Sequence, residues 1–345
     1  MKTFAVLILL ALISIPAGAA LSERFVSIRI RLFKDLEQLP IISDSTVKQL
    51  SQNLFMVEGK QLSYQGKKIA SKNFIIKKTN SKFDLIANVD FNAYLAGVVS
   101  KEMPLSWPLE ALKAQAVIAR SYALTKIRER QNKVFHLDTD QMDQVFAFTN
   151  SEKAKKAVSS TDQVVLKDQK NKILKAFYHS DCGGQTVPAS QVWKGAYDAG
   201  TAIDPWCANR KSNEWTYEVP KEEFYQRLSI QEPEAKLEVA ENFKSKIQSL
   251  SSMEQIFSVQ KIREIFGFSL VRNSPTSYQE TDDVVQLKGK GFGHGAGLCQ
   301  WGTLAQVRLG RSYLQVLEHY YPKATVTTNE SFRLSQVMMS DLVFK

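Results

Sequence analysis

The chain has 345 residues, of which 44% are hydrophobic, and its 45 Lys and Arg against 35 Asp and Glu give a net charge of +10. Such an apolar content is ordinary for a protein with a real hydrophobic core, and the length allows one large or two modest domains. The basic residues are scattered rather than striped, which together with predicted export excludes nucleic acid as the expected partner. A bacterial cell wall offers an anionic partner instead.

Residues 1–19 predict a secretory signal peptide, with a positive start at Lys2, an apolar stretch over residues 4–15 and a small-residue cleavage site at 17–19. The alternative is an uncleaved N-terminal anchor, although the apolar run is short for a membrane span. No later segment is apolar enough to cross a bilayer. We therefore expect an exported protein, periplasmic or extracellular and associated with the cell wall, without a stable membrane span in the mature chain.

Residues 20–88 contain short segments in which apolar and polar residues alternate, separated by polar or Gly-containing turns. This pattern predicts a small β-rich N-terminal region. The apolar run at 94–99 then predicts a strand. Pro104 and Pro108 interrupt this pattern, and Ser106 can cap a following amphipathic helix that we expect to end near Arg130.

Further along the chain, residues 162–178 predict a β-hairpin with its turn at 168–171, and residues 220–275 predict a mostly helical insertion. One last amphipathic helix is expected after residue 302. Between the predicted insertion and this last helix, glycine occupies every second position of 289–297. If this segment is extended, all five glycines lie on one bare face, which permits close contact with a strand, a helix or a flat sugar chain.

Glu102 is the candidate catalytic residue. It lies between the predicted strand and helix, beside apolar and aromatic residues, and a carboxylate on a rigid turn suits general acid catalysis when burial raises its pKa. The alternative is a solvated turn residue paired with Lys101 or Lys113.

Three separated segments together resemble the stage II sporulation protein D (SpoIID) family, which includes peptidoglycan lytic transglycosylases and amidase enhancers. They are YLAGVVSKEMPLSWPLEALKAQAVIARSYA, HSDCGG and GFGHGAGLCQWG. The resemblance implies an α+β fold with a catalytic domain over 89–330 and a tail at 331–345, and it makes Glu102 the catalytic acid and base. It also implies a substrate groove formed by Lys113, Gln115, Arg120, Tyr122, Gln144, His179, Ser180, His294 and Gln300.

The chain has three cysteines, and in an oxidising compartment the simplest arrangement is one disulfide and one free thiol. We expect the disulfide between Cys182 and Cys207, with Cys299 as a small buried thiol. Some family members bind zinc through His and Cys in this region, so zinc on His179, Cys182 and Cys207 is the alternative, although a structural site normally has four ligands. No metal or other cofactor is otherwise expected.

The resemblance implies cleavage of the β-1,4 bond between N-acetylmuramic acid and N-acetylglucosamine, with formation of a 1,6-anhydro ring. One carboxylate suffices for this reaction. Lysozyme-like hydrolysis is the alternative and requires a second carboxylate. Its candidates are Asp138, Asp140, Asp143 and Asp181. A non-catalytic module that binds and activates a cell-wall amidase is a third possibility. The expected partners are peptidoglycan glycan strands and, in the third case, an amidase.

Overall fold

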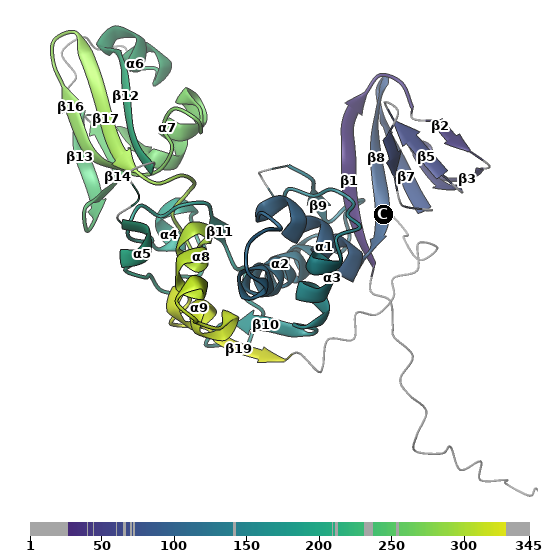
Figure 1. Ribbon diagram of the computed structural model, residues 1–345. Coiled ribbons are helices and arrows are strands. Elements are labelled where there is room, and N and C mark those ends of the chain that lie inside the picture. The colour runs from purple at the N-terminus through teal and green to yellow at the C-terminus, as the bar shows by residue number, and fades with distance from the viewer. Residues whose placement is uncertain are drawn as a thin grey trace, which may run out of the picture.

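The computed structural model describes residues 27–39, 41–43, 45–59, 61–64, 67–69, 71, 73–140, 143–208, 210, 213–230, 237–252 and 255–328. The predicted signal peptide and the C-terminal tail lie outside the described residues. The described elements form several sheets and packed helices, which confirms the α+β class. Figure 1 shows an N-terminal sheet and a second β-rich lobe at opposite ends of the molecule, with most of the helices between them.

The N-terminal sheet has the strand order β3-β4-β7-β8-β1-β9. Its strands pair antiparallel, except that β9 runs parallel to β1 and joins a later part of the chain to this sheet. Ile28 and Ile30 point into the core from β1 and are fully buried. The strands are β1 (Ser27–Leu36), β3 (Thr46–Ser51), β4 (Leu54–Glu58), β7 (Asn73–Thr79), β8 (Lys82–Asp90) and β9 (Leu137–Asp138), and a separate sheet contains β2 (Ile41–Ser43), β5 (Gln61–Tyr64) and β6 (Lys67–Ile69).

The predicted strand at 94–99 is wrong, because these residues belong to helix α1 (Phe91–Glu102). The Asp90 carboxylate caps this helix by accepting a hydrogen bond from the backbone N–H of Ala93 at 2.8 Å. A short apolar run fits either a buried strand or a buried helix, and the cap settles which one forms. As a result, Glu102 is the last residue of a helix rather than part of a free turn.

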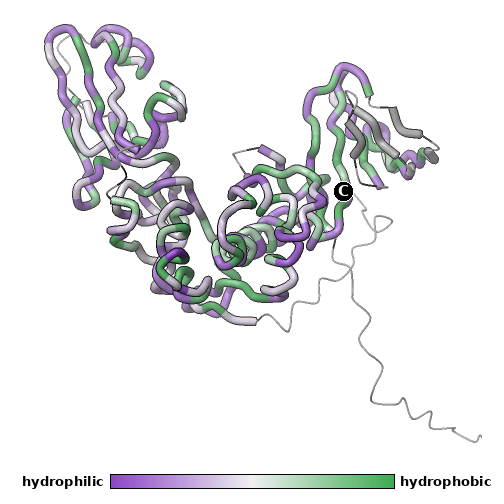
Figure 2. Tube along the Cα trace, in the orientation of Figure 1, coloured by the Kyte–Doolittle hydropathy of each residue, from purple (hydrophilic) through white to green (hydrophobic). Residues whose placement is uncertain are grey.

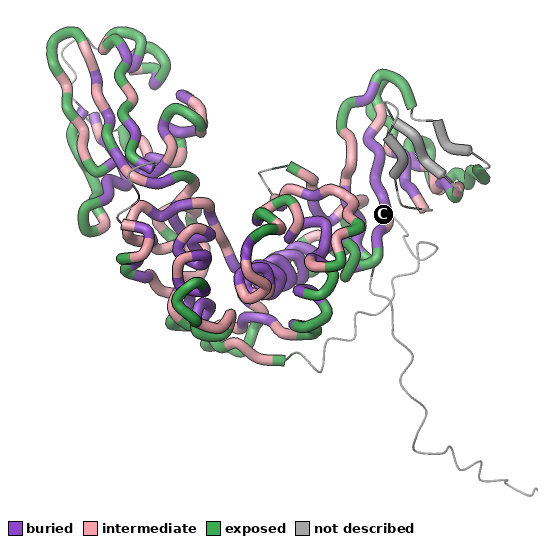
Figure 3. The backbone as a smooth tube through the Cα atoms, viewed as in Figure 1, coloured by how far each residue is buried: buried purple, intermediate pink, exposed green. Residues whose placement is uncertain are grey.

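Helix α2 (Leu109–Glu129) has the predicted end, since Arg130 is its C-cap. Pro108 is its N-cap and no side chain caps it, so the predicted capping by Ser106 is wrong. The helix is buried almost all round, and its buried residues include the charged Arg120 and Lys126. Figures 2 and 3 show it as a buried rod with apolar stretches at the centre of the molecule.

The elements around α2 come largely from the second half of the chain. Helices α3 (Glu152–Ser159), α8 (Gln300–Arg308) and α9 (Tyr313–Tyr320) contact it, and Gly310 with a φ of 87° separates α8 from α9, where a single helix was expected. The predicted hairpin at 162–178 is reduced to a turn and one bridge, because β10 (Val164–Lys167) pairs with β19 (Thr325–Thr328). The remaining elements here are β11 (Tyr178–His179), α4 (Ala189–Val192), α5 (Pro205–Ala208) and β18 (Leu298–Cys299).

The predicted helical insertion at 220–275 is wrong, since this region lies in a β-rich lobe with its own core. Glu and Lys are frequent here because they occupy exposed strand faces and turns, as in the exposed strand at 238–243. In the described part of this region the helices are short, at 221–227 and 259–266. Two three-stranded sheets contain β12 (Glu214–Pro220), β17 (Val284–Lys290) and β16 (Pro275–Glu280), and β13 (Glu238–Phe243), β14 (Lys246–Ser252) and β15 (Gln255–Ser258), with helices α6 (Lys221–Arg227) and α7 (Val259–Phe266).

The glycine-rich segment is not extended beyond Lys290, because Gly291, Gly293, Gly295 and Gly297 all have positive φ. The expected close backbone contact is nevertheless present. A Cβ on Gly297 would lie 1.9 Å from the carbonyl oxygen of Phe177. The segment therefore packs against the chain that leads into β11, and glycine is required both by φ and by space.

No helix of the described residues is long and apolar enough to cross a membrane.

Candidate active site

A cavity of about 1280 Å³ brings together side chains from all three segments singled out in the sequence. Glu102 reaches it from the end of α1, His179 and Ser180 from β11 and the residue after it, His294 from the glycine-rich segment, and Gln300 from the start of α8. The parallel pairing of β11 with β18 places these last segments side by side, with Tyr178 opposite Leu298 and His179 opposite Cys299.

The Glu102 carboxylate is held by donors from other segments. The backbone N–H of Val145 donates to Oε1 at 3.1 Å, and hydrogen bonding to the side chains of Tyr178 and Gln300 also favours the ionised form. Burial opposes these effects and is the largest of them, so the pKa of Glu102 is raised above its ordinary value. Lys113, one of the alternative partners, instead pairs with Glu110 at 2.6 Å.

Two buried glutamines lie next to the residues that bind the Glu102 carboxylate. Gln144 is buried, accepts a hydrogen bond from the Tyr94 hydroxyl at 3.0 Å, and directly precedes the Val145 that binds Glu102. The amide of Gln300 lies 3.5 Å from Oε1 of the fully buried Gln115. Neither Gln144 nor Gln115 lines the cavity, so both act on Glu102 through a neighbour.

An aromatic wall surrounds the two histidines. The His294 ring lies 4.7 Å from Trp193 and 5.5 Å from His179, and Trp193 stacks on Phe177 at 4.1 Å. His179 Nδ1 donates to the carbonyl oxygen of Ala296 at 3.0 Å. Burial lowers the pKa of His179 to about 4 and also lowers that of His294, so both rings are neutral near pH 7. Trp193 and Phe177 were not predicted as site residues, although both flank the HSDCGG segment.

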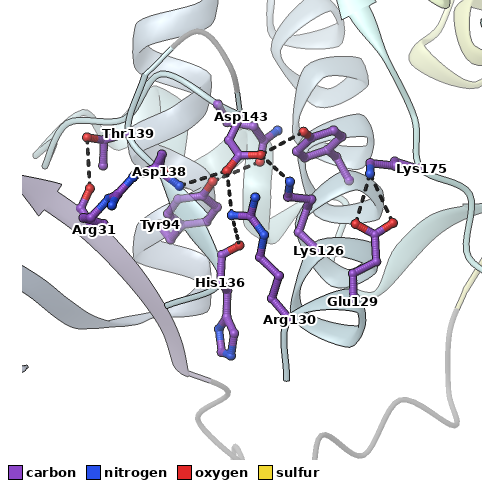
Figure 4. Close-up of polar contacts among 12 residues, drawn as sticks. Arg31, Tyr94, Lys126, Glu129, Arg130, His136, Asp138, Thr139, Asp143 and Lys175 are labelled. Atoms are coloured by element: carbon purple, nitrogen blue, oxygen red, sulfur yellow. Dashed lines mark hydrogen bonds and ion pairs between the residues drawn. The ribbon is translucent and has the colours of Figure 1, made fainter. Parts of the chain in front are cut away.

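Asp143 is the carboxylate among the four hydrolysis candidates that lines the cavity. Its oxygens lie 2.6 Å from Lys126 Nζ and 3.2 Å from Arg130 Nη1, and they accept hydrogen bonds from the Tyr122 hydroxyl at 3.1 Å and the backbone N–H of Asp138 at 2.9 Å. Figure 4 shows how these side chains converge on Asp143.

The other three candidates lie elsewhere. Asp138 forms a salt bridge with Arg31 at 2.5 Å that ties the loop to the N-terminal sheet. Asp181 lies 3.2 Å from Arg210 and receives a hydrogen bond from the backbone N–H of Gly183 at 2.8 Å. Asp140 also has an interaction partner.

Four residues expected in the groove do not line the cavity: Lys113, Gln115, Arg120 and Gln144. Arg120 is the clearest case. Its guanidinium donates to the carbonyl oxygens of Val158 and Val164, each at 3.1 Å, and burial lowers its pKa to about 10. The other five expected groove residues do line the cavity: Tyr122, His179, Ser180, His294 and Gln300.

The expected disulfide between Cys182 and Cys207 is not formed, since all three cysteines are free and buried. The residues that could bind a metal ion here also differ from the zinc ligands expected from the sequence. Cys182 and Cys207 come together with Cys299 and Asp204, whose ligand atoms all lie within 4.8 Å of one another. His179 is directed to Ala296 instead. Sequence spacing gave no sign of this group, because parallel pairing of β11 with β18 brings Cys299 to the other two cysteines.

Comparison with known proteins agrees with this geometry. Residues 79–167 match the SpoIID family model, described as stage II sporulation protein, and this range contains Glu102. The chain is 28% identical over 284 residues to stage II sporulation protein D of Bacillus amyloliquefaciens, covering 73% of this chain and 78% of the relative. It is 29% identical over 251 residues to an uncharacterized protein of Brachyspira hyodysenteriae, covering 70% and 68%.

A third relative is the amidase enhancer of Bacillus subtilis, which is 26% identical over 296 residues. The match covers 68% of this chain but only 40% of the enhancer. Together these findings confirm the resemblance seen in the sequence and support the SpoIID family, through the family model over residues 79–167 and through relatives that match 68–73% of the chain.

Proposed function

We propose that this protein cleaves peptidoglycan glycan strands between N-acetylmuramic acid and N-acetylglucosamine, with Glu102 as the single acid and base and with 1,6-anhydro-muramyl ends as products. A cell-wall-related role follows from relatives named for sporulation and for amidase enhancement. The observation that carries the proposal is the position of Glu102: a largely buried carboxyl with a raised pKa in the wall of a large cavity.

Glu102 serves in two successive proton transfers. In its protonated form it donates a proton to the glycosidic oxygen as the bond to C1 of the muramyl sugar breaks. The resulting carboxylate then accepts the proton of the C6 hydroxyl, whose oxygen forms the new bond to C1. Between these steps the Val145 N–H, Tyr178 and Gln300 stabilise the negative charge. Glu102 ends the cycle protonated, so neither water nor a second carboxylate is consumed.

The surroundings of Asp143 support transglycosylation over hydrolysis. An ordinary glycosidase needs a second carboxylate to act as a nucleophile or to activate water. Asp143 shares the cavity with Glu102, but Lys126 and Arg130 neutralise it and four donors or cations occupy its oxygens. With its oxygens engaged in this way, Asp143 is not free to bind a water molecule or to attack a sugar carbon, and its role is to fix the loop that carries Val145.

The cavity walls suit a sugar chain. Trp193 and Phe292 present aromatic surface there, and Lys172, Lys175 and Lys194 add positive charge. Aromatic rings pack on the apolar faces of sugars, and lysines can attract the carboxylates that peptidoglycan carries.

The test is digestion of purified sacculi followed by mass spectrometry of the released fragments. We expect the wild type to release fragments with anhydro ends, and Glu102→Gln to lose at least about 100-fold in rate, because a positioned acid contributes about 10²–10⁴-fold. Glu110→Gln is the matched control: it lies in the same segment, pairs with Lys113 and does not line the cavity. Its rate should stay close to that of the wild type.

Other outcomes would contradict the proposal. Reducing ends in place of anhydro ends would indicate hydrolysis. If both wild type and Glu102→Gln released nothing but stimulated an added cell-wall amidase equally, the protein would be a binding activator.

A further inference from the structure

The lining of the cavity carries more positive than negative charge, with eight Lys and Arg side chains and four carboxylates. Two of the lysines belong to ion pairs, which Figure 4 shows on the last turns of α2. Lys126 Nζ lies 2.6 Å from an oxygen of Asp143, and Lys175 Nζ lies 3.0 Å from an oxygen of Glu129. The excess of positive charge therefore comes from other residues.

Two arginines of the lining belong to the wall itself. Arg29 and Arg263 are buried, and each donates a hydrogen bond to a backbone carbonyl oxygen, at 3.0 and 2.9 Å respectively. The Asp168 carboxylate is also engaged, because its Oδ1 accepts hydrogen bonds from the backbone N–H groups of Lys170 and Lys172, each at 2.9 Å. This contact fixes the turn that carries the Lys172 side chain.

Four cations of the lining remain, and we call them the basic rim. They are Arg128 near the end of α2, Lys167 at the end of β10, Lys172 in the turn that follows, and Lys194 after α4. Within the part of the chain that the structure describes, none of the four forms an ion pair. Lys167 is half-buried and the other three are exposed, so the basic rim lies at the edge of the cavity that solvent reaches.

This position suits groups that project from a glycan strand rather than the sugar rings. The rings are expected on aromatic surface such as Trp193, which directly precedes Lys194. A stem peptide leaves the strand at the lactyl group of a muramyl sugar and carries more than one carboxylate. A stripped strand, from which the peptides have been removed, keeps a single carboxylate beside each muramyl ring. Four cations from three segments of the chain match the larger and more widely spread charge of the peptide.

We propose that the basic rim binds the carboxylates of stem peptides, so that the protein favours glycan strands that still carry peptides over stripped strands. The inference rests on the proposed function for its choice of polymer, and it adds which form of the strand the cavity selects. None of the four rim residues belongs to the three segments that resemble the family. The preference is therefore a property of this chain's own residues.

Binding to a variant without the catalytic acid tests the basic rim apart from the chemistry. Glu102→Gln is titrated with soluble strands of equal length, either peptide-bearing or stripped, and with chitin oligosaccharides, which carry no carboxylate. We expect the peptide-bearing strands to bind about 10-fold more tightly than the stripped strands. This advantage should shrink as NaCl rises from about 0.05 M to about 0.5 M, because salt screens exposed charges.

A double substitution, Lys172→Gln with Lys194→Gln, assigns the effect to the basic rim. In the Glu102→Gln background it should weaken binding of peptide-bearing strands by about 5- to 10-fold and leave binding of stripped strands unchanged. Lys170→Gln is the matched control, because Lys170 is exposed in the same turn but does not line the cavity. It should bind both forms as its parent does.

The possible failures are distinguishable. Equal or tighter binding of stripped strands, an advantage that salt does not change, or a double variant that binds like its parent would overturn the role of the basic rim while leaving the proposed function in place. Failure of Glu102→Gln to bind any of the three polymers, with an unchanged melting temperature, would overturn the proposed function as well.

Discussion

At the scale of single residues, the surroundings of Glu102 act on its pKa in two opposing ways. Burial favours the protonated form, whereas the Val145 N–H together with Tyr178 and Gln300 stabilises the carboxylate. Because burial is the larger effect, the native protein holds this proton to a higher pH than the unfolded chain does. The consequence is a measurable link between pH and stability.

We expect the free energy of unfolding of the wild type to fall, relative to Glu102→Gln, as pH rises from about 4 to about 7. In this window the native state binds more protons than the unfolded state, so the slope of stability against pH is negative. Gln cannot ionise and removes this contribution. Denaturant titrations of both proteins at several pH values measure it. Curves that stay parallel, or a variant that loses stability with pH relative to the wild type, would show that the pKa is not raised.

At the scale of secondary-structure elements, α2 owes its place to a buried arginine as well as to apolar packing. The Arg120 guanidinium satisfies carbonyl oxygens at the end of α3 and at the start of β10. It therefore joins α2 to α3 and to β10, which follow it in the chain. Arg120 thus has a structural role in holding α2 against its neighbours.

We expect Arg120→Met to lower the free energy of unfolding by about 2–4 kcal/mol, because it removes two buried hydrogen bonds from a charged donor. Lys113→Met is the control. Its partly exposed pair with Glu110 should contribute at most about 1 kcal/mol. Denaturant unfolding measures both. If Arg120→Met were as stable as the wild type but bound glycan strands much more weakly, Arg120 would belong to the groove, as the sequence implied.

At the scale of the whole molecule, the two largest hydrophobic cores of the described residues are separate. The larger core joins the N-terminal sheet to the helices that carry the cavity, and a second core fills the lobe of β12–β17. Phe224 lies at the centre of the second core, where it stacks on Phe266 at 4.6 Å. Since no buried residue in the described part of the chain belongs to both cores, a cavity in the lobe should destabilise the lobe without destabilising the larger core.

We expect Phe224→Ala to destabilise the lobe by about 3–5 kcal/mol, the usual effect of removing a buried phenyl ring. Hydrogen exchange should speed up in β12 and β17 and stay unchanged in α2. Ile256→Ala, in the same lobe but 73% exposed, should change neither. Equal loss of protection in α2 would mean that the two cores unfold as one unit.

The sequence by itself determined the features that depend on local pattern. The apolar spacing and the flanking prolines predicted α2 and its end, and three short segments identified the family and Glu102. Spacing alone, however, could not tell whether residues 94–99 form a strand or a helix, because the deciding contact is the cap at Asp90. Nor could composition show that a segment rich in Glu and Lys forms two sheets, since charged residues suit any exposed surface.

Only the tertiary structure decided how distant residues meet. Gln144 and Arg120, both implied as groove residues, do not line the cavity, and Gln144 Oε1 and the Arg120 guanidinium bind partners within the core. The cysteines show the same principle. Cys182 and Cys299 are 117 residues apart, and it is the parallel pairing of β11 with β18 that brings them together. Long-range packing therefore decides which side chains share a site.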